Sequence, residues 1–352
     1  MEAVPISRPR AAAGALALAA LTAGASQAFA ARHHTAPKTD LAILMTSPNA
    51  ADVVTEARAL GLHTVRFSQD AANPKRRPGF AVFRRAGFRM VLTVNYDQRP
   101  ANGGRPSHPP VGAAALATYR RRLASLLDAT GRPALLQVGN EEIAPRFFTG
   151  TMPQYVAQLN AAVSVAHRRG IKVTNGGLTS EPVALLTWDD LRRHGHAAEA
   201  DRFAARAFSD PNDRWILRDL RAKPFRGLRR AALQAGWDRA RQLIPAFRAS
   251  HMDYVNFHWY HHDARALAPV VAYLRRATRK PVVTTEIGQY DLRADVVTAD
   301  LRAVVSKLRL PFVVWFDADG MPARGLHDAP GRLRANGRAF RAYVEAHRAL
   351  LR

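Results

Sequence analysis

The chain has 352 residues, of which 47% are hydrophobic and 23% charged, so it is long enough for one large globular domain and too apolar for a disordered chain. It contains no cysteine, which excludes a disulfide framework and catalysis by a thiolate. The formal net charge of +24 comes mostly from arginines spread along the sequence, and no basic run interleaved with aromatic residues indicates nucleic-acid binding. This charge could serve to bind an acidic partner, or it could reflect only a general abundance of arginine in the composition.

The first 30 residues have the pattern of a secretory signal peptide. Two arginines precede an apolar stretch at 11–25 that is too short for a comfortable membrane span. The sequence Ala-Phe-Ala at 28–30 fits the small-x-small cleavage pattern. We therefore expect residues 1–30 to be removed and 31–39 to form a polar leader. The mature protein would be secreted or periplasmic, with no stable membrane insertion; an uncleaved anchor is the alternative.

From residue 40 onward, short apolar runs alternate with stretches of helical period. Most of the runs are nearly continuous hydrophobics, as in parallel strands that are buried on both faces. The predicted strands are 41–45, 63–67, 89–94, 134–138, 171–174, 254–258, 282–285 and 312–315. The predicted helices are 50–60, 79–85, 113–128, 153–169, 236–249, 264–278, 295–308 and 332–350.

Eight β/α units in one chain predict an α/β fold, a single (β/α)8 barrel over residues 40–352. The alternative, an open doubly wound sheet, usually carries a glycine-rich loop after its first strand, but residues 46–49 contain no glycine. One interval is longer than the others: about 180–240, after strand five, is predicted as a helical insertion. It would lie on the face where barrel active sites are built, either as a wall of the substrate cleft or as a packing elaboration.

Two glutamates follow predicted strands at that face. Glu141 follows strand four and Glu286 ends strand seven, so their carboxylates would face each other across the barrel mouth. Retaining glycoside hydrolysis needs this arrangement: one carboxylic acid protonates the leaving oxygen, while the other, about 5–5.5 Å away, attacks the anomeric carbon. A cation such as Arg66, at the end of strand two, would help the nucleophile to stay ionised.

The motifs around these glutamates resemble those of a known group. The sequence Gly-Asn-Glu at 139–141 and the sequence Thr-Thr-Glu-Ile-Gly at 284–288 are similar to the two signatures of the large clan of (β/α)8 retaining glycoside hydrolases, which includes cellulases, mannanases and β-xylosidases. The resemblance runs from about residue 41 to the C-terminus. It does not identify a family within the clan.

The resemblance implies roles for the residues at the two motifs. Glu141 would be the acid/base and Glu286 the nucleophile of a double-displacement reaction on a poly- or oligosaccharide. Asn140 would bind the sugar 2-hydroxyl, a contact that strengthens in the transition state. No cofactor and no metal is implied.

The resemblance also implies partners on other strands. Tyr260 would hydrogen-bond the nucleophile, Arg66 would hold it ionised, and His258 would contact the substrate or support the nucleophile. Trp315 would form a stacking floor beneath the sugar, since aromatic faces suit the apolar face of a pyranose. Two of these residues have a structural alternative: Arg66 could be an ion-pair residue of the barrel, and Trp315 could be a core residue.

Two other functions stay open. The same polar and aromatic groups could make a carbohydrate-binding barrel without catalysis. A metal-dependent barrel hydrolase could use His258, His261, His262 and Asp263, although the first strand supplies no metal ligand. The sugar, its acidic or neutral character and the oligomeric state are not indicated by the sequence.

Three further carboxylates follow the same strands. Glu142 is expected to be solvated beside Glu141. Asp317 and Asp319, after strand eight, would either bind sugar hydroxyls or cap a loop.

Overall fold

The computed structural model describes residues 38–46, 49–72, 79–98, 106–222, 224–288, 293–317 and 325–352. Residues Pro37–Arg352 form one compact unit. The predicted signal peptide, 1–30, and the leader up to residue 37 lie outside the described residues. Within the described part of the chain, no helix combines the length and the apolar character needed to cross a membrane.

The eight predicted strands form one sheet in which neighbouring strands pair in parallel. They are β1 (Asp40–Met45), β2 (Thr64–Asp70), β3 (Arg89–Asn95), β6 (Leu135–Val138), β7 (Val173–Asn175), β8 (Val255–Trp259), β9 (Val282–Ile287) and β10 (Phe312–Asp317). Neighbours follow chain order, and β1 pairs with β10. Isolated bridges from Thr174 to Tyr254 and from Leu178 to Phe257 join the β7 side to β8 and close the ring. The predicted (β/α)8 barrel is confirmed.

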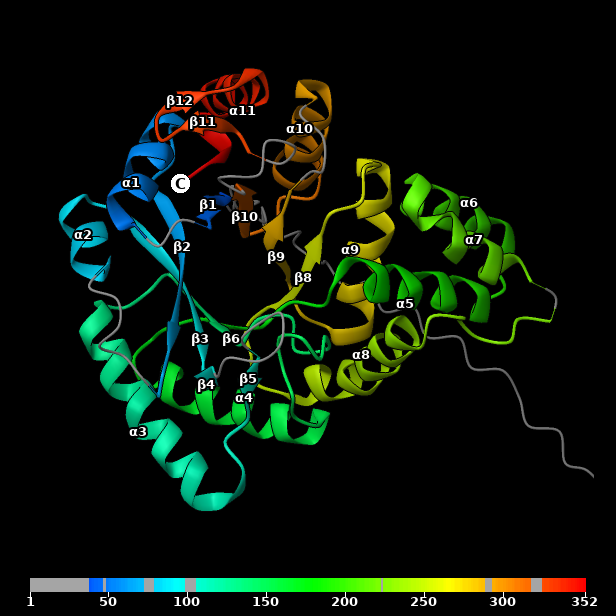
Figure 1. Ribbon diagram of the computed structural model, residues 1–352, viewed down its shortest axis with the longest axis horizontal. Helices are drawn as coiled ribbons and strands as arrows, with labels where there is room; N and C mark the ends of the chain where they lie inside the picture. Colours follow the sequence, from blue (N-terminus) through cyan, green and yellow to red (C-terminus); the bar gives the residue numbers. More distant parts are fainter. Residues whose placement is uncertain are drawn as a thin grey trace, which may run out of the picture. The chain divides into compact units, whose positions relative to one another are not determined.

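Helices lie outside this ring of strands (Figure 1). They are α1 (Ala50–Ala59), α2 (Gly79–Arg85), α3 (Gly112–Thr130), α4 (Met152–His167), α8 (Ala231–Ala249), α9 (Leu267–Thr278), α10 (Ala294–Leu301) and α11 (Ala335–Ala346). At α4, Thr151 and Gln154 form a reciprocal capping box and Pro153 lies in the first turn, which explains why the helix begins there.

Two predicted helices end or begin elsewhere. The stretch predicted as one helix over 295–308 is α10 followed by a π-helical turn, η4 (Arg302–Lys307). The stretch predicted as helix from residue 332 starts with a hairpin of β11 (His327–Ala329) and β12 (Arg332–Leu333). Gly331, at φ +83°, makes the turn of that hairpin, so α11 begins only at Ala335.

The long interval after the fifth barrel strand, β7, is helical, as predicted. It holds α5 (Ser180–Arg193), α6 (Ala197–Ala207), η2 (Pro211–Asp213) and α7 (Arg214–Arg221) before α8. Helix α5 packs against β8, α8 and α9, so it forms part of the layer around the barrel, and α6 packs on α5 (Figure 1). Trp188 of α5 meets Trp237 of α8 edge to face, with 6.5 Å between ring centroids.

Side chains along the strands alternate between the barrel interior and the helix layer. A small buried cluster fills the interior, with Ala42, Val91, Leu135, Val283, Phe312 and Val314. The larger cluster lies between strands and helices, and it includes Val313 and Trp315 of β10. This alternation decides which side chains at the strand ends can face a substrate.

Candidate active site

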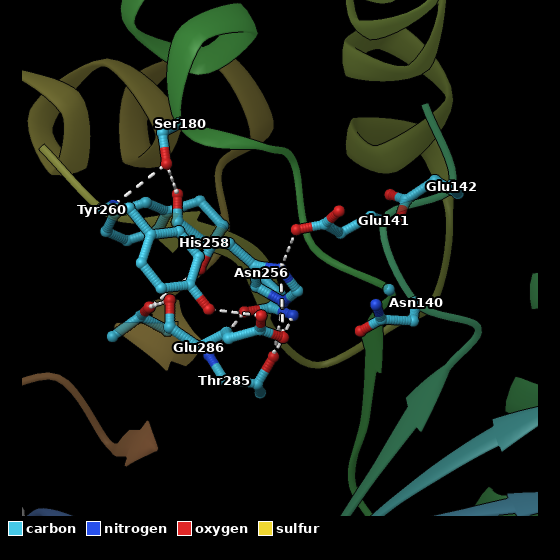
Figure 2. Close-up of polar contacts among 12 residues, drawn as sticks. Asn140, Glu141, Glu142, Ser180, Asn256, His258, Tyr260, Thr285 and Glu286 are labelled. Atoms are coloured by element: carbon cyan, nitrogen blue, oxygen red, sulfur yellow. Dashed lines mark hydrogen bonds and ion pairs between the residues drawn. The ribbon is translucent and has the colours of Figure 1, made fainter. Parts of the chain in front are cut away.

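Glu141 and Glu286 lie close together where β6 and β9 end (Figure 2). One carboxylate oxygen of each and one ring nitrogen of His258 all lie within 4.8 Å of one another. Both carboxylates are largely enclosed: Glu141 is 4% exposed, and the side chain of Glu286 is 13% exposed. The structure therefore brings together the two glutamates that the sequence predicts as a pair.

The backbone at Glu141 is held in an uncommon conformation. Its φ of +46° lies in the left-handed region, which costs an L-residue roughly 1–2 kcal/mol. The Glu141 N–H donates to the Gly176 carbonyl (3.2 Å), and the Glu141 carbonyl accepts from the Ala144 N–H (2.9 Å). Such strain persists only where the surrounding structure enforces it, and it clusters at functional sites.

Opposing effects act on the charge of Glu286. Its burial raises the pKa, but the charges of His258 and Arg66 and the hydrogen bonds from Tyr260 and Arg66 outweigh this and hold the pKa below its usual value. The Arg66 Nη1 lies 2.8 Å from Oε2, and the Tyr260 hydroxyl donates to Oε1. Because Arg66 is always charged, it favours the carboxylate whatever the protonation state of His258.

Arg66 is buried and uses its whole guanidinium within the site. Nε donates to Thr93 Oγ1 (2.9 Å), Nη1 also donates to the Thr285 carbonyl (2.7 Å), and Nη2 donates to Asn140 Oδ1 (2.6 Å). The amide oxygen of Asn140 is thus engaged by Arg66. The NH2 end of Asn140 is the part that can donate to a sugar hydroxyl.

His258 lies between the two glutamates and has no exposed surface. Its Nδ1 is 3.1 Å from Glu141 Oε1 and 3.6 Å from Glu286 Oε2, and its Nε2 is 3.2 Å from Thr285 Oγ1. A glycine makes room for the ring: a Cβ at Gly177 would lie 2.3 Å from Nε2. His258 therefore contacts both carboxylates from a position with no accessible surface.

The prediction that Trp315 forms a stacking floor is wrong. Its side chain is 1% exposed and packs edge to face against Phe340 of α11, with 5.6 Å between centroids. The alternation along β10 turns it toward the helices. The next residue, Phe316, is partly exposed and meets Tyr260 edge to face at 6.0 Å. Counting by two from interior-facing Val314 would have selected Phe316.

Glu142 is fully buried, which corrects the expectation that it is solvated. It lies beyond Glu141, on the side away from Glu286 (Figure 2). Its Oε1 accepts from Asn175 Nδ2 (2.9 Å), and burial raises its pKa to about 7. The chain of contacts continues from Asn175 Oδ1, which accepts from the backbone N–H of Asn256 (2.7 Å).

Sequence reasoning missed Asn256 and Thr285. Asn256 Nδ2 donates to Thr285 Oγ1 (2.5 Å), and Asn256 Oδ1 accepts from the Thr285 N–H (2.9 Å), so this pair fixes the residue that precedes Glu286. Asn256 stands two residues before His258 on the same face of β8, which is the signal that would have found it.

The other histidines, which follow β8, contact different residues from those that His258 contacts. The His261 Nδ1 lies 3.5 Å from Asp213 Oδ2, and the His262 Nε2 lies 3.2 Å from Asp210 Oδ2. Asp263 caps the short helix η3 (Ala264–Ala266), where its Oδ1 accepts from a backbone N–H. The histidine run therefore does not form the metal site that a metallohydrolase would need.

Two clusters of possible metal ligands occur among the described residues. One is Glu141, His258 and Glu286, and the other is Glu56, Asp317 and His327. In the first cluster the guanidinium of Arg66 already supplies a cation beside Glu286, so the arrangement fits an acid/base and nucleophile pair better than a metal.

In the second cluster Asp317 caps a loop. Its Oδ1 accepts from the Leu326 N–H (2.7 Å), and its Oδ2 lies 2.6 Å from the His327 Nδ1. Asp317 is buried and does not face a substrate. Asp319 lies outside the described residues.

No protein-family model matches the sequence, and no curated protein matches it. Among solved structures, the chain is similar to a glucosidase from Croceicoccus marinus, with a TM-score of 0.52 and 13% identity over 83% of this chain and 62% of that one. It is also similar to a family 128 (subgroup II) endo-β-1,3-glucanase from Sorangium cellulosum, with a TM-score of 0.51 and 14% identity over 87% and 98%.

A third similar structure is a family 39 glycoside hydrolase from Bacteroides cellulosilyticus, with a TM-score of 0.51 and 12% identity over 86% of this chain and 63% of that one. The chain thus spans less than two thirds of the glucosidase and of the family 39 enzyme. The chain therefore shares the (β/α)8 fold of solved glycoside hydrolases, and the likeness selects no single family among them.

Proposed function

We propose that the protein is a retaining glycoside hydrolase. The observation that carries the proposal is the closeness of the two carboxylates: one oxygen of Glu141 and one oxygen of Glu286 lie within 4.8 Å of each other. Retaining enzymes hold the two groups about 5–5.5 Å apart, whereas inverting enzymes need about 6.5–9.5 Å to admit a water molecule between them. The distance between Glu141 and Glu286 favours direct attack on the sugar.

The surroundings of the two glutamates support different roles. Glu286 accepts from Arg66 and Tyr260, which favours the ionised form that a nucleophile needs. Glu141 has one buried oxygen, Oε2, with no hydrogen-bond partner among the described residues, and its nearest arginine, the exposed Arg146, is 3.6 Å away. Glu286 is therefore the better nucleophile, which leaves the acid/base role to Glu141.

The reaction follows in two steps. Glu286 attacks the anomeric carbon while Glu141 gives its proton to the leaving oxygen, so one C–O bond forms as the glycosidic C–O bond breaks. Glu141, now a carboxylate, then takes a proton from water, and that water displaces Glu286 from the sugar. The NH2 group of Asn140 would donate to the 2-hydroxyl during both steps.

The substrate we propose is a poly- or oligosaccharide outside the cytoplasm, because the first 30 residues have the pattern of a signal peptide. The fold is shared with an endo-β-1,3-glucanase, which makes β-glucans the first class to assay. The acidic glycans suggested by the net charge form the second class, and their hydrolysis would fall with salt.

The test is a panel of glycans and aryl glycosides with single variants. We expect Glu286→Gln to lower kcat/KM by about 10³-fold or more on every substrate that the unmodified protein cleaves. Glu141→Gln should do the same for poor leaving groups and spare the first step for activated aryl groups, which need no protonation. Asp128→Asn, in an exposed ion pair on α3, is the control. Full activity of Glu286→Gln would end the proposal; saturable binding without turnover would indicate a binding barrel.

A further inference from the structure

A cavity of about 290 Å³ adjoins the candidate catalytic pair on the side of the helical insertion. Tyr260 belongs to both places, because it lines the cavity and its hydroxyl donates to Glu286. The volume lies at the lower end of the range for ligand pockets, about 300–1,000 Å³, and suits a single sugar unit. A group bound there would lie next to Tyr260, which contacts Glu286.

The cavity is acidic although the protein is strongly basic. Three carboxylates line it: Glu181 in the first turn of α5, and Asp210 and Asp213 at η2. Of the described residues in its wall, none is Lys or Arg, whereas the whole sequence has 52 basic and 28 acidic residues. The local charge is therefore opposite to the composition and is not explained by it.

A second observation also points to a ligand. His261 lines the cavity and is only 5% exposed, and its Nε2 has no hydrogen-bond partner among the described residues. The ring is held edge to face by Phe208 and Trp259, so it cannot easily turn this nitrogen elsewhere. Buried polar atoms are nearly always hydrogen-bonded, and a ligand in the cavity would supply the missing partner.

We propose that this cavity is a subsite for one sugar unit that carries a free, protonated amine. The proposal rests on the glycosidase function and names the substrate class of that site. An ammonium group donates three hydrogen bonds and has no acceptor, which matches a wall with three carboxylates and neither Lys nor Arg. The ring hydroxyls of the same unit can bond His261 Nε2. A uronic acid unit would meet repulsion from Asp210 and Asp213.

This assignment gives the helical insertion after β7 a function. Helix α5 supplies Glu181, and the turn at η2 supplies Asp210 and Asp213, whereas the strand end supplies Tyr260 and His261. The barrel would therefore provide the chemistry, and the insertion would select the sugar beside it.

The test compares D-glucosamine, D-glucose and D-glucuronate as ligands of the full chain at neutral pH, by calorimetry or ligand-observed NMR. We expect glucosamine to bind about tenfold or more tightly than glucose, and glucuronate to bind more weakly than glucose. The variant Asp210→Asn with Asp213→Asn should abolish this order. Asn can still accept from the Asn212 N–H as Asp210 does (2.7 Å), so the turn should keep its cap. Asp128→Asn is the matched control, and it should keep the order.

The outcomes separate the two proposals. Equal binding of glucosamine and glucose, in a protein whose hydrolysis depends on Glu286, would overturn the subsite and leave the glycosidase standing. Preferential binding of glucosamine that needs Asp210 and Asp213, without hydrolysis of any glycoside, would keep the cavity assignment and reject the catalytic one. Binding of Ca²⁺ lost in the same double variant, with no preference for glucosamine, would also overturn the subsite.

Discussion

Two carboxylates near the barrel mouth, one fully buried and one largely buried, have opposite surroundings. Glu286 faces Arg66 and Tyr260, and its pKa is held below the usual value despite burial. Glu142 has the amide of Asn175 as its side-chain partner, so burial raises its pKa to about 7. The guanidinium of Arg66 beside Glu286 accounts for part of the difference, because a nearby cation favours the ionised form of a carboxyl group.

The raised pKa of Glu142 makes a prediction about stability. Below pH 4.5 the carboxyl is protonated in both states; as the pH rises toward 7, the unfolded chain loses the proton while the folded protein keeps it. Stability from this group is therefore lost over that window, by roughly 3 kcal/mol. In Glu142→Gln the side chain cannot titrate and still offers an acceptor to Asn175. Between pH 4.5 and 7.5, the free energy of unfolding of the unmodified protein should therefore fall by roughly 3 kcal/mol more than that of the variant. Urea denaturation across this range tests it, and parallel profiles for the two proteins would contradict it.

At the residue scale, the sequence predicted much of the site. Asn140, Glu141 and Glu286 follow strand ends in recognisable motifs, and the structure brings them together with Arg66 and Tyr260. Two predictions were wrong, those for Trp315 and Glu142. Neighbouring residues of a strand point to opposite faces, and Trp315 points outward because it is one residue away from an inward-facing position. Glu142 is enclosed because Gly176 of the next loop closes over it.

At the element scale, the loop after β7 positions the catalytic groups. The Gly176 carbonyl accepts from the Glu141 N–H and from Gln137 Nε2 (2.7 Å), and Gly177 leaves room for His258. The absence of a side chain at these two positions allows the loop to approach β6 and β8 closely. The position of Glu141, which follows β6, therefore depends on the two glycines that follow β7.

Gly177→Ala should reduce catalysis through this contact. Its φ of +110° disfavours an L-residue, and the added Cβ would collide with the ring of His258 between the two glutamates. We expect kcat/KM to fall about tenfold or more. Gly170→Ala is the control, because its φ of +67° is also positive while no atom lies within 4 Å of its Cβ position. It should lose about 1 kcal/mol of stability and keep kcat/KM. Equal kinetics for both variants would show that His258 need not be held in place.

The strand pattern was predictable because buried parallel strands have continuous apolar runs. The hairpin of β11 and β12 was not, because residues 332–350 keep a helical period throughout and only the turn at Gly331 and the pairing with β11 break it. The π-helical turn η4 likewise has no clear local signal.

At the scale of the whole molecule, the two ends of the barrel have separate tasks. The glutamates stand at one end, whereas Asp40, at the start of β1, joins strands at the other. Asp40 is buried, and its Oδ1 accepts from Thr64 Oγ1 (3.1 Å) and from Arg89 Nη1 (2.6 Å). Arg352, at the C-terminus, lies 3.9 Å from its Oδ2. In barrels of this type the end away from the active site serves stability.

Asp40→Ala should therefore lower stability and leave catalysis unchanged. Removal of a buried partner from these contacts should reduce the free energy of unfolding by about 2–3 kcal/mol. Thermal or urea denaturation measures this, and kcat/KM determined well below the melting temperature should match that of the unmodified protein. A matching loss of kcat/KM would show that the two ends of the barrel are coupled.

The net charge shows the limit of composition as evidence. A total of +24 suggested an acidic partner, yet the cavity beside Tyr260 is lined by three carboxylates. All three, Glu181, Asp210 and Asp213, are remote from Tyr260 in sequence, so only the fold brings their charge to the site. A sum over the chain cannot contain this information.

The proposed reaction depends on a covalent bond between Glu286 and the sugar. The most direct test uses a 2-deoxy-2-fluoro glycoside of the best substrate with an activated leaving group, followed by peptide mapping by mass spectrometry. A retaining mechanism predicts one glycosyl adduct per chain, located on Glu286 and absent from Glu286→Gln, together with a first product of retained anomeric configuration. A first product of inverted configuration, or an adduct on another residue, would contradict it.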